Sequence, residues 1–139
     1  AISSAENVDF DQVFDRIVAN AVELSARPIK YRKLGEFGVY DSQKATPLAL
    51  IITELIHNAL EHGLSDDGDQ LTVEIQSSNG LTKVIVGDNG VGLPEGFDID
   101  GSSNLGLQIV KTLTENELKG TISLTRNQSN TEAILSFKN

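Results

Sequence analysis

Two polar side chains, Glu54 and Asn58, interrupt the most apolar helical segment of the sequence. Their spacing of four residues places both on one face of a helix. A carboxylate and an amide oxygen are ligands that a hard cation such as Mg²⁺ prefers, with water and substrate phosphates completing its shell. A carboxylate can also take up a reacting proton. A solvated stripe on a half-buried helix explains the same pair, so both interpretations stay open at this point.

A second group of such residues is Asp88, Gly90 and Gly92, which follows directly after a predicted strand. Glycine lets the backbone approach a flat ligand closely. An ionised carboxylate only accepts hydrogen bonds, which suits an exocyclic amino group of such a ligand. An ordinary glycine-rich turn would have the same composition.

A third group is Leu105 and Gly106, at the start of a predicted helix. The free N–H groups of a helix N-terminus bind anions, and a glycine there allows close approach. Simple capping of the helix by Ser103 or Asn104 is the alternative.

Hydrophobic periodicity predicts the elements that must position these residues. Helices are expected at 9–24 with Asp9 as N-cap, at 46–61 with Thr46 as N-cap and Pro47 at the first helical position, and from Leu105 to a point before Gly120. Strands are expected at 29–33, 37–40, 71–75, 81–86, 121–125 and 133–137, and Asn79-Gly80 predicts a hairpin turn. This order predicts an α+β fold, a two-layer sandwich with helices on one face of a sheet.

The order and spacing of the three groups carry more information than each group alone. Glu54-x-x-x-Asn58, Asp88-x-Gly90-x-Gly92 and Leu105-Gly106-Leu107 resemble the N, G1 and G2 boxes of the GHKL ATP-binding superfamily, which includes gyrase, Hsp90, histidine kinases and MutL. The segments ELIHNALEHG and LGLQIVKTL look like the catalytic ATP-binding domain of a bacterial sensor histidine kinase with a short lid. The resemblance implies a Bergerat-type fold with a mixed sheet, and a single such domain over residues 1–139.

The resemblance also implies roles for these residues. Glu54 would be the catalytic base or the carboxylate that orients the nucleophile, and Asn58 would hold the Mg²⁺ that bridges the triphosphate of ATP. Asp88 would accept a hydrogen bond from the adenine amino group. Gly90 and Gly92 would shape the adenine pocket and the hinge of the lid, and Leu105 and Gly106 would lie at the phosphate end.

The sequence departs from the family pattern in three places. Glu61 stands where many of these kinases have a basic residue that can contact phosphate. Asn104 occupies a position that is glycine in many G2 boxes, which leaves Gly106 alone. The short segment between the G1 and G2 boxes has no phenylalanine-rich box, although it contains Phe97.

Composition excludes several classes of protein. The chain has 139 residues and a formal net charge of -9, which argues against a nucleic-acid binder that tracks phosphates. It has no cysteine, so disulfides and thiolate metal sites are excluded, and it has no apolar run long enough to span a bilayer. The absence of methionine, even at position 1, predicts a piece of a longer protein.

The resemblance predicts a cytoplasmic kinase domain that binds ATP and Mg²⁺ and works with an upstream dimerisation and phosphoacceptor domain and with a response regulator. In the kinases that the sequence resembles, the phosphoacceptor histidine lies on a separate dimerisation helix. His57 and His62 lie on or just after the predicted N-box helix, so neither is expected to be the phosphoacceptor. Two alternatives stay open: a serine kinase of the anti-sigma-factor type, and a nucleotide-binding module without catalysis.

Overall fold

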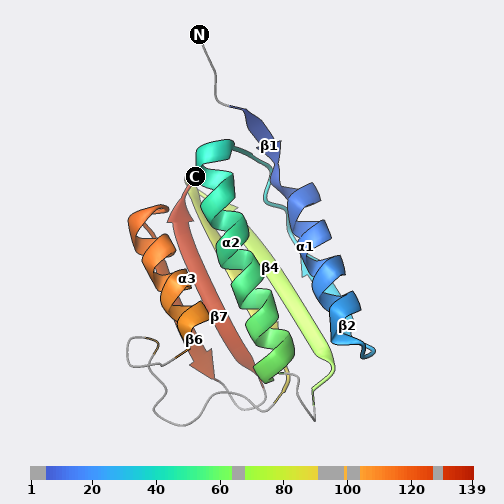
Figure 1. Ribbon diagram of the computed structural model, residues 1–139. Coiled ribbons are helices and arrows are strands. Elements are labelled where there is room, and N and C mark those ends of the chain that lie inside the picture. The colour runs from blue at the N-terminus through green and yellow to red at the C-terminus, as the bar shows by residue number, and fades with distance from the viewer. Residues whose placement is uncertain (1–5, 64–67, 91–98, 100–103, 127–129) are drawn as a thin grey trace.

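The computed structural model describes residues 6–63, 68–90, 99, 104–126 and 130–139. Three helices cover one face of a sheet (Figure 1). In chain order the elements are β1 (Asn7–Asp9), α1 (Phe10–Ser25), β2 (Lys30–Leu34), β3 (Val39–Asp41), α2 (Ser42–Asn58), a π-helical turn η1 (Ala59–Gly63), β4 (Gln70–Ser78), β5 (Leu81–Asp88), α3 (Leu105–Asn116), β6 (Thr121–Arg126) and β7 (Thr131–Lys138). The predicted α+β two-layer class is confirmed.

The main sheet has five strands in the order β2-β4-β5-β7-β6. Strands β2 and β4 are parallel, whereas every other neighbouring pair in this sheet is antiparallel. The sheet is therefore mixed, as expected. Strands β1 and β3 form a separate antiparallel pair beside the helix layer.

The hairpin between β4 and β5 turns at Asn79-Gly80, as the sequence predicts. Asn79 has φ 55° and Gly80 has φ 77°, and Ser78 pairs with Leu81 directly beside them. Positive φ at both central residues is the requirement of the tight hairpin turn that asparagine and glycine favour.

The core lies between the helices and the sheet. Alternate residues of β5 and β7 are buried against the helices, so the period-two pattern in the sequence is the signature of a one-sided sheet. The fully buried side chains of this layer are Phe10, Phe14, Leu48, Ile51, Ile52, Ile56, Leu71, Val73, Val84, Leu135 and Phe137.

The predicted start of the second helix is wrong by one turn. Helix α2 begins at Ser42, and its N-cap is Asp41, whose Oδ1 accepts a hydrogen bond of 3.0 Å from the Lys44 backbone N–H. Thr46 lies inside the helix and donates its hydroxyl to the Ser42 carbonyl at 3.0 Å. Pro47 therefore stands inside the helix rather than at its first position.

Helix α1 begins where the sequence predicts. The side chain of Asp9 caps it by accepting a hydrogen bond from the Asp11 backbone N–H, and it ends at Ala26 in the left-handed conformation with φ 55°. Strand β1, which directly precedes this helix, was not expected. None of the helices in the described ranges is long and apolar enough to cross a membrane.

Candidate functional site

The N-box side chains of α2 meet the N-terminus of α3. A Cβ atom added to Gly106 would lie 2.5 Å from Oε2 of Glu54, so the carboxylate rests directly against the glycine backbone. Both residues are half-buried, and α2 packs against α3 along this side. Two segments that are about fifty residues apart in the chain thus lie against each other.

Asn104 connects the two helices from the other side of Gly106. Its Oδ1 accepts the Leu107 backbone N–H at 3.1 Å and so caps α3. Its Nδ2 donates to Oδ1 of Asn58 at 3.4 Å. The predicted capping by asparagine and the predicted N-box pair therefore belong to the same cluster of side chains.

Asp88 lies at the end of β5 and is only 7% exposed. Burial raises the pKa of its carboxyl group, and a hydrogen bond of 3.1 Å from the Gly90 backbone N–H offsets part of this rise. A buried carboxyl group at a strand end is a candidate acceptor for a donor from a ligand. Two residues of the predicted group, Asp88 and Gly90, are thus joined by a hydrogen bond that the sequence did not predict.

Thr131 is a further polar residue of this site that sequence reasoning missed. It lies directly opposite Asp88 in the β5–β7 ladder. Its Oγ1 is buried and has no hydrogen-bond partner among the described residues. A buried hydroxyl without a partner costs free energy, so this atom indicates a group that a ligand or water satisfies. Thr131 precedes the strand predicted at 133–137, so only its position in the structure reveals it.

Asn89, between Asp88 and Gly90, holds the segment in place. Its Oδ1 accepts backbone N–H groups of Asp69 at 3.0 Å and Gln70 at 2.9 Å. These bonds tie the end of β5 to the start of β4. The middle residue of the motif therefore has a structural function.

The remaining predicted residues are distributed as follows. Leu105 begins α3 and is 73% exposed. Gly92 and Phe97 lie outside the described residues, so the predicted lid hinge is not placed. Glu61 contacts His57, with 3.0 Å between Oε1 and Nε2, and both side chains are exposed.

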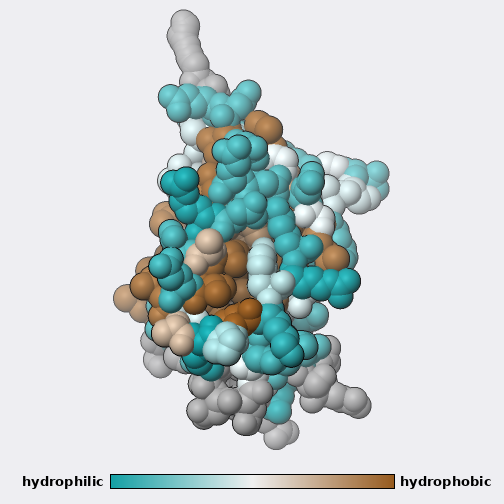
Figure 2. Space-filling model, turned by 90° about the vertical axis from the view of Figure 1, so that its right-hand side faces the viewer, coloured by the Kyte–Doolittle hydropathy of each residue, from teal (hydrophilic) through white to brown (hydrophobic). Residues whose placement is uncertain are grey.

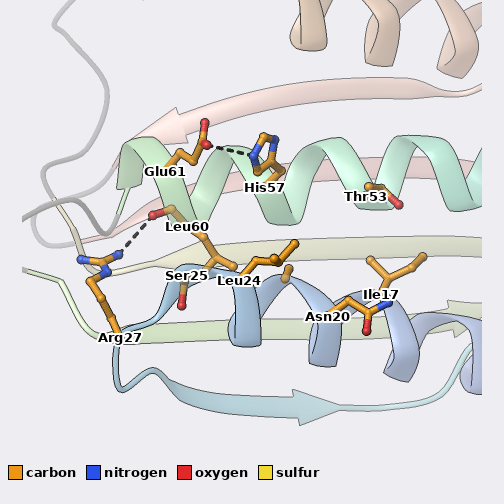
Figure 3. Close-up of a pocket in the computed structure, with 10 residues that line it drawn as sticks. Ile17, Asn20, Leu24, Ser25, Arg27, Thr53, His57, Leu60 and Glu61 are labelled. Carbon is orange, nitrogen blue, oxygen red and sulfur yellow. Dashed lines mark hydrogen bonds and ion pairs between the residues drawn. The ribbon is translucent and has the colours of Figure 1, made fainter.

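A hollow of about 720 Å³ lies between α1 and α2 (Figure 3), and none of the predicted site residues lines it. Its lining consists of Ile17, Asn20, Ala21, Leu24, Ser25, Arg27, Thr53, His57, Leu60 and Glu61. Arg27 reaches across it and donates to the Leu60 carbonyl at 3.1 Å. Figure 2 shows apolar surface gathered on the side of the molecule where α1 lies, with hydrophilic side chains around it. This hollow is separate from the cluster around Glu54 and Asn58.

Comparison with curated proteins finds relatives among bacterial kinases. Sensor histidine kinase PdtaS of Mycobacterium tuberculosis is 41% identical over 128 residues, which cover 89% of this chain and 26% of that protein. Blue-light-activated histidine kinase 2 of Erythrobacter litoralis is 34% identical over 92 residues, which cover 64% of this chain and 26% of that protein. The chain thus spans about a quarter of the length of these relatives.

Solved structures share the fold. The histidine kinase domain of a blue-light-activated histidine kinase from Erythrobacter litoralis superposes with a TM-score of 0.87 at 24% identity, covering 99% of this chain and 65% of that one. The ATP-binding domain of PrrB from Mycobacterium tuberculosis superposes with a TM-score of 0.77 at 22% identity, and 97% of each chain is covered.

The family described as histidine kinase-, DNA gyrase B- and HSP90-like ATPase matches residues 43–139, which hold all three boxes. The matched range contains α2, both strands of the central hairpin, α3 and the last two strands. The chain therefore belongs to the family of histidine kinase-, DNA gyrase B- and HSP90-like ATPases.

Proposed function

We propose that the chain is the Mg-ATP-binding catalytic domain of a sensor histidine kinase, which transfers the γ-phosphoryl group of ATP to a histidine on a separate dimerisation domain. The observation that carries this proposal is the meeting of Glu54 and Asn58 with the N-terminus of α3 at Gly106. This arrangement combines acidic and amide oxygens with backbone donors, which is the set of groups that a metal-bound polyphosphate requires.

The adenine end of the proposed site consists of Asp88 and Thr131. The carboxylate of Asp88 accepts a hydrogen bond from the exocyclic amino group of adenine. The hydroxyl of Thr131 gains a hydrogen-bond partner when adenine or an accompanying water lies beside it. Gly90 keeps the backbone close to the ring, and Gly92 is the proposed hinge of the lid. The burial of Asp88 supports this assignment, because pockets for flat ligands such as adenine are mostly apolar and contain a few well-placed polar groups.

The residues present fit Mg²⁺ as the metal. No group of three or more His, Cys, Asp or Glu side chains that could hold a metal ion occurs among the described residues. A metal held by Asn58 would therefore take most of its ligands from phosphates and water, which is the usual coordination of Mg²⁺. When bound, Mg²⁺ supplies positive charge that neutralises the phosphate oxygens.

Glu54 is the proposed base or orienting carboxylate. It lies at the phosphate end, where it accepts the proton of an incoming imidazole N–H or holds the ring in line. A phosphorus–nitrogen bond forms at the imidazole nitrogen as the bond between the γ-phosphorus and the bridging oxygen breaks, and ADP leaves. Positioning and charge stabilisation supply most of the catalysis in such a transfer.

The surface of α3 supports docking of the phosphoacceptor domain next to this carboxylate. Leu105 is 73% exposed and Ile109 is 42% exposed, and with Gln108, Thr112 and Leu113 they line a shallow apolar hollow. Because Leu105 precedes Gly106, a domain seated there would bring its histidine close to the γ-phosphate.

The relatives favour this function over the alternatives, since they are named as histidine kinases. The anti-sigma-factor type of serine kinase has no such support. A response regulator as the next phosphoryl acceptor, and a location in the cytoplasm, are parts of the same proposal.

Nucleotide binding is the first test. Calorimetric titration of the chain with Mg-ATP should show binding, and Asp88→Asn should weaken it by about 10- to 100-fold, because a hydrogen bond to a charged group is lost. Glu115→Gln, an exposed position near the end of α3, changes the net charge equally and should bind as the wild type does. Equal binding by wild type and Asp88→Asn, or binding by neither, would contradict the proposal.

Phosphoryl transfer is the second test, carried out on a longer protein that includes the proposed phosphoacceptor domain. With Mg-ATP the wild type should form phosphohistidine, and Glu54→Gln should lose most of this activity while it still binds ATP. Nucleotide binding by a wild type that forms no phosphohistidine would instead favour a non-catalytic module.

A further inference from the structure

We propose that Asn104 is a positioning residue, which locks the side-chain amide of Asn58 so that its oxygen faces the N-terminus of α3. This inference rests on the proposed function, because the oxygen of Asn58 is the proposed ligand of Mg²⁺. Asn104 is also the residue that departs from the glycine found at this position in many G2 boxes.

The orientation of the Asn104 amide follows from its cap. The Leu107 backbone N–H can only donate, so the end of the amide that faces it, at 3.1 Å, must be Oδ1. The opposite end, Nδ2, therefore points toward α2, where it lies 3.4 Å from Asn58. Helix capping thus determines which group Asn104 presents to its neighbour.

The Asn104 amide in turn determines the orientation of Asn58. If the Asn58 amide were turned over, its NH₂ group would face the NH₂ group of Asn104, and two donors would oppose each other. The favoured orientation has the Asn58 oxygen toward α3. A carbonyl oxygen has two lone pairs, so one accepts the bond from Asn104 and the other remains for a cation.

Space at Gly106 permits this arrangement. A Cβ atom on Gly106 would lie 3.2 Å from Oδ1 of Asn104 and 2.5 Å from Oε2 of Glu54, so both side chains flank a position that only glycine leaves open. Gly106 is retained at the point where the side chains of Glu54 and Asn104 converge. At position 104, which is glycine in many G2 boxes, this chain has an asparagine that caps α3 and donates to Asn58. A glycine at position 104 would provide neither the cap nor the donor.

The test separates the cap from the contact with Asn58. Serine caps helices as well as asparagine but is too short to reach Asn58. Asn104→Ser should therefore keep the cap of α3 and leave the melting temperature of the protein nearly unchanged. We expect the affinity for Mg-ATP to fall about three- to tenfold, the effect of one ordinary hydrogen bond. The affinity for ATP in excess EDTA should not change, because the contact acts through the metal ligand.

One control variant and three possible outcomes make the test decisive. Asn20→Ser makes the same substitution on the exposed face of α1 and should change neither affinity. Equal losses with and without Mg²⁺ would assign Asn104 a merely structural role, and no loss in either would show that it does not position Asn58; both results overturn the inference. A wild type that binds no Mg-ATP would instead contradict the proposed function itself.

A variant of Asn58 tests the same inference at the residue that Asn104 is proposed to position. Asn58→Asp has two equivalent oxygens, so it needs no neighbour to select one of them. In this background Asn104→Ser should cost little or nothing in Mg-ATP affinity. An undiminished loss would show that Asn104 acts by another route.

Discussion

Asp88 has opposite effects on the free protein and on the proposed complex. Its burial raises the pKa of the carboxyl group, which means that folding disfavours the charged form, although the Gly90 N–H offsets part of this cost. The same charge and position suit it to an adenine amino group. A residue with a proposed role in binding thus lowers the stability of the free protein.

Replacing Asp88 by asparagine should therefore stabilise the nucleotide-free protein near neutral pH, by a few degrees in melting temperature. An acid whose folded pKa is raised binds more protons in the folded state, so its contribution to stability falls as pH rises from its ordinary pKa of about 3.8 through the raised folded pKa. The advantage of Asp88→Asn should grow over this window and persist above it. Thermal melts across pH measure it, and a variant that is less stable than wild type at pH 7 would contradict the argument.

At this scale, spacing identified the residues that share a family pattern, and it did so before any geometry was known. Glu54 and Asn58 lie beside the start of α3 at Gly106, and Asp88 is buried at the end of β5; their roles stay predictions. Thr131 and the contact made by Asn104 could not be predicted in this way, because a threonine in a strand and an asparagine before a helix have ordinary local explanations. Their roles depend on contacts between distant segments.

At the scale of elements, one carboxylate fastens the segment before β3 to the first turn of α1. Asp11 accepts the backbone N–H groups of Phe37 and Gly38 and the ammonium group of Lys33, each at 2.9 Å. Burial raises the pKa of Asp11, but the two backbone bonds and Lys33 outweigh this, and the net pKa is lowered. The connection places β3 and the start of α2 relative to α1.

Asp11→Asn should destabilise the protein by about 1–3 kcal/mol at neutral pH, because bonds to a charged acceptor become bonds to a neutral one. Since the folded pKa is lowered, the stabilisation by Asp11 is present above pH 3.8 and is lost as pH falls through the folded value. Urea unfolding at several pH values should therefore show a gap between wild type and variant that closes in acid. Asp15→Asn is the matched control: its carboxylate is 64% exposed and lies 3.5 Å from the same Lys33, and its loss should cost less than about 1 kcal/mol.

Most elements were predictable from period and turn chemistry, and the failures have physical causes. Thr46-Pro47 has the composition of a helix start, yet Asp41 caps the helix one turn earlier, and local preference does not distinguish the two. Strand β1 has three residues and is formed through its pairing with β3, so it has no pattern of its own. The parallel pairing of β2 with β4 joins segments separated by α2, and no local signal encodes it.

At the scale of the whole molecule, a net charge of -9 opposes a triphosphate ligand. The proposed site overcomes this repulsion with a metal ion and with the N-terminus of α3 rather than with basic side chains, and Glu61 stands where a basic residue is common. Nucleotide affinity should therefore depend on Mg²⁺ more strongly than in a basic site.

Removal of Mg²⁺ with EDTA should reduce the affinity for ATP on the order of tenfold or more, since the metal carries the compensating charge. The affinity for adenosine, which has no phosphate, should be unaffected. Calorimetry with both ligands, with and without EDTA, gives the comparison. Equal affinity for ATP in the two conditions would show that phosphates are held by protein groups alone.

The pairing of β5 with β7 also governs how this chain folds. These strands are joined in the centre of the sheet across residues 89–130, and α3 lies within that span. Pairing two strands that are so far apart in the sequence costs chain entropy before their contacts form. Folding should therefore take milliseconds or longer rather than microseconds. Asp88 and Thr131 meet only when these strands pair, so the proposed adenine end of the site is absent from any chain in which the strands are still apart. A nucleotide should consequently slow unfolding and leave the folding rate unchanged.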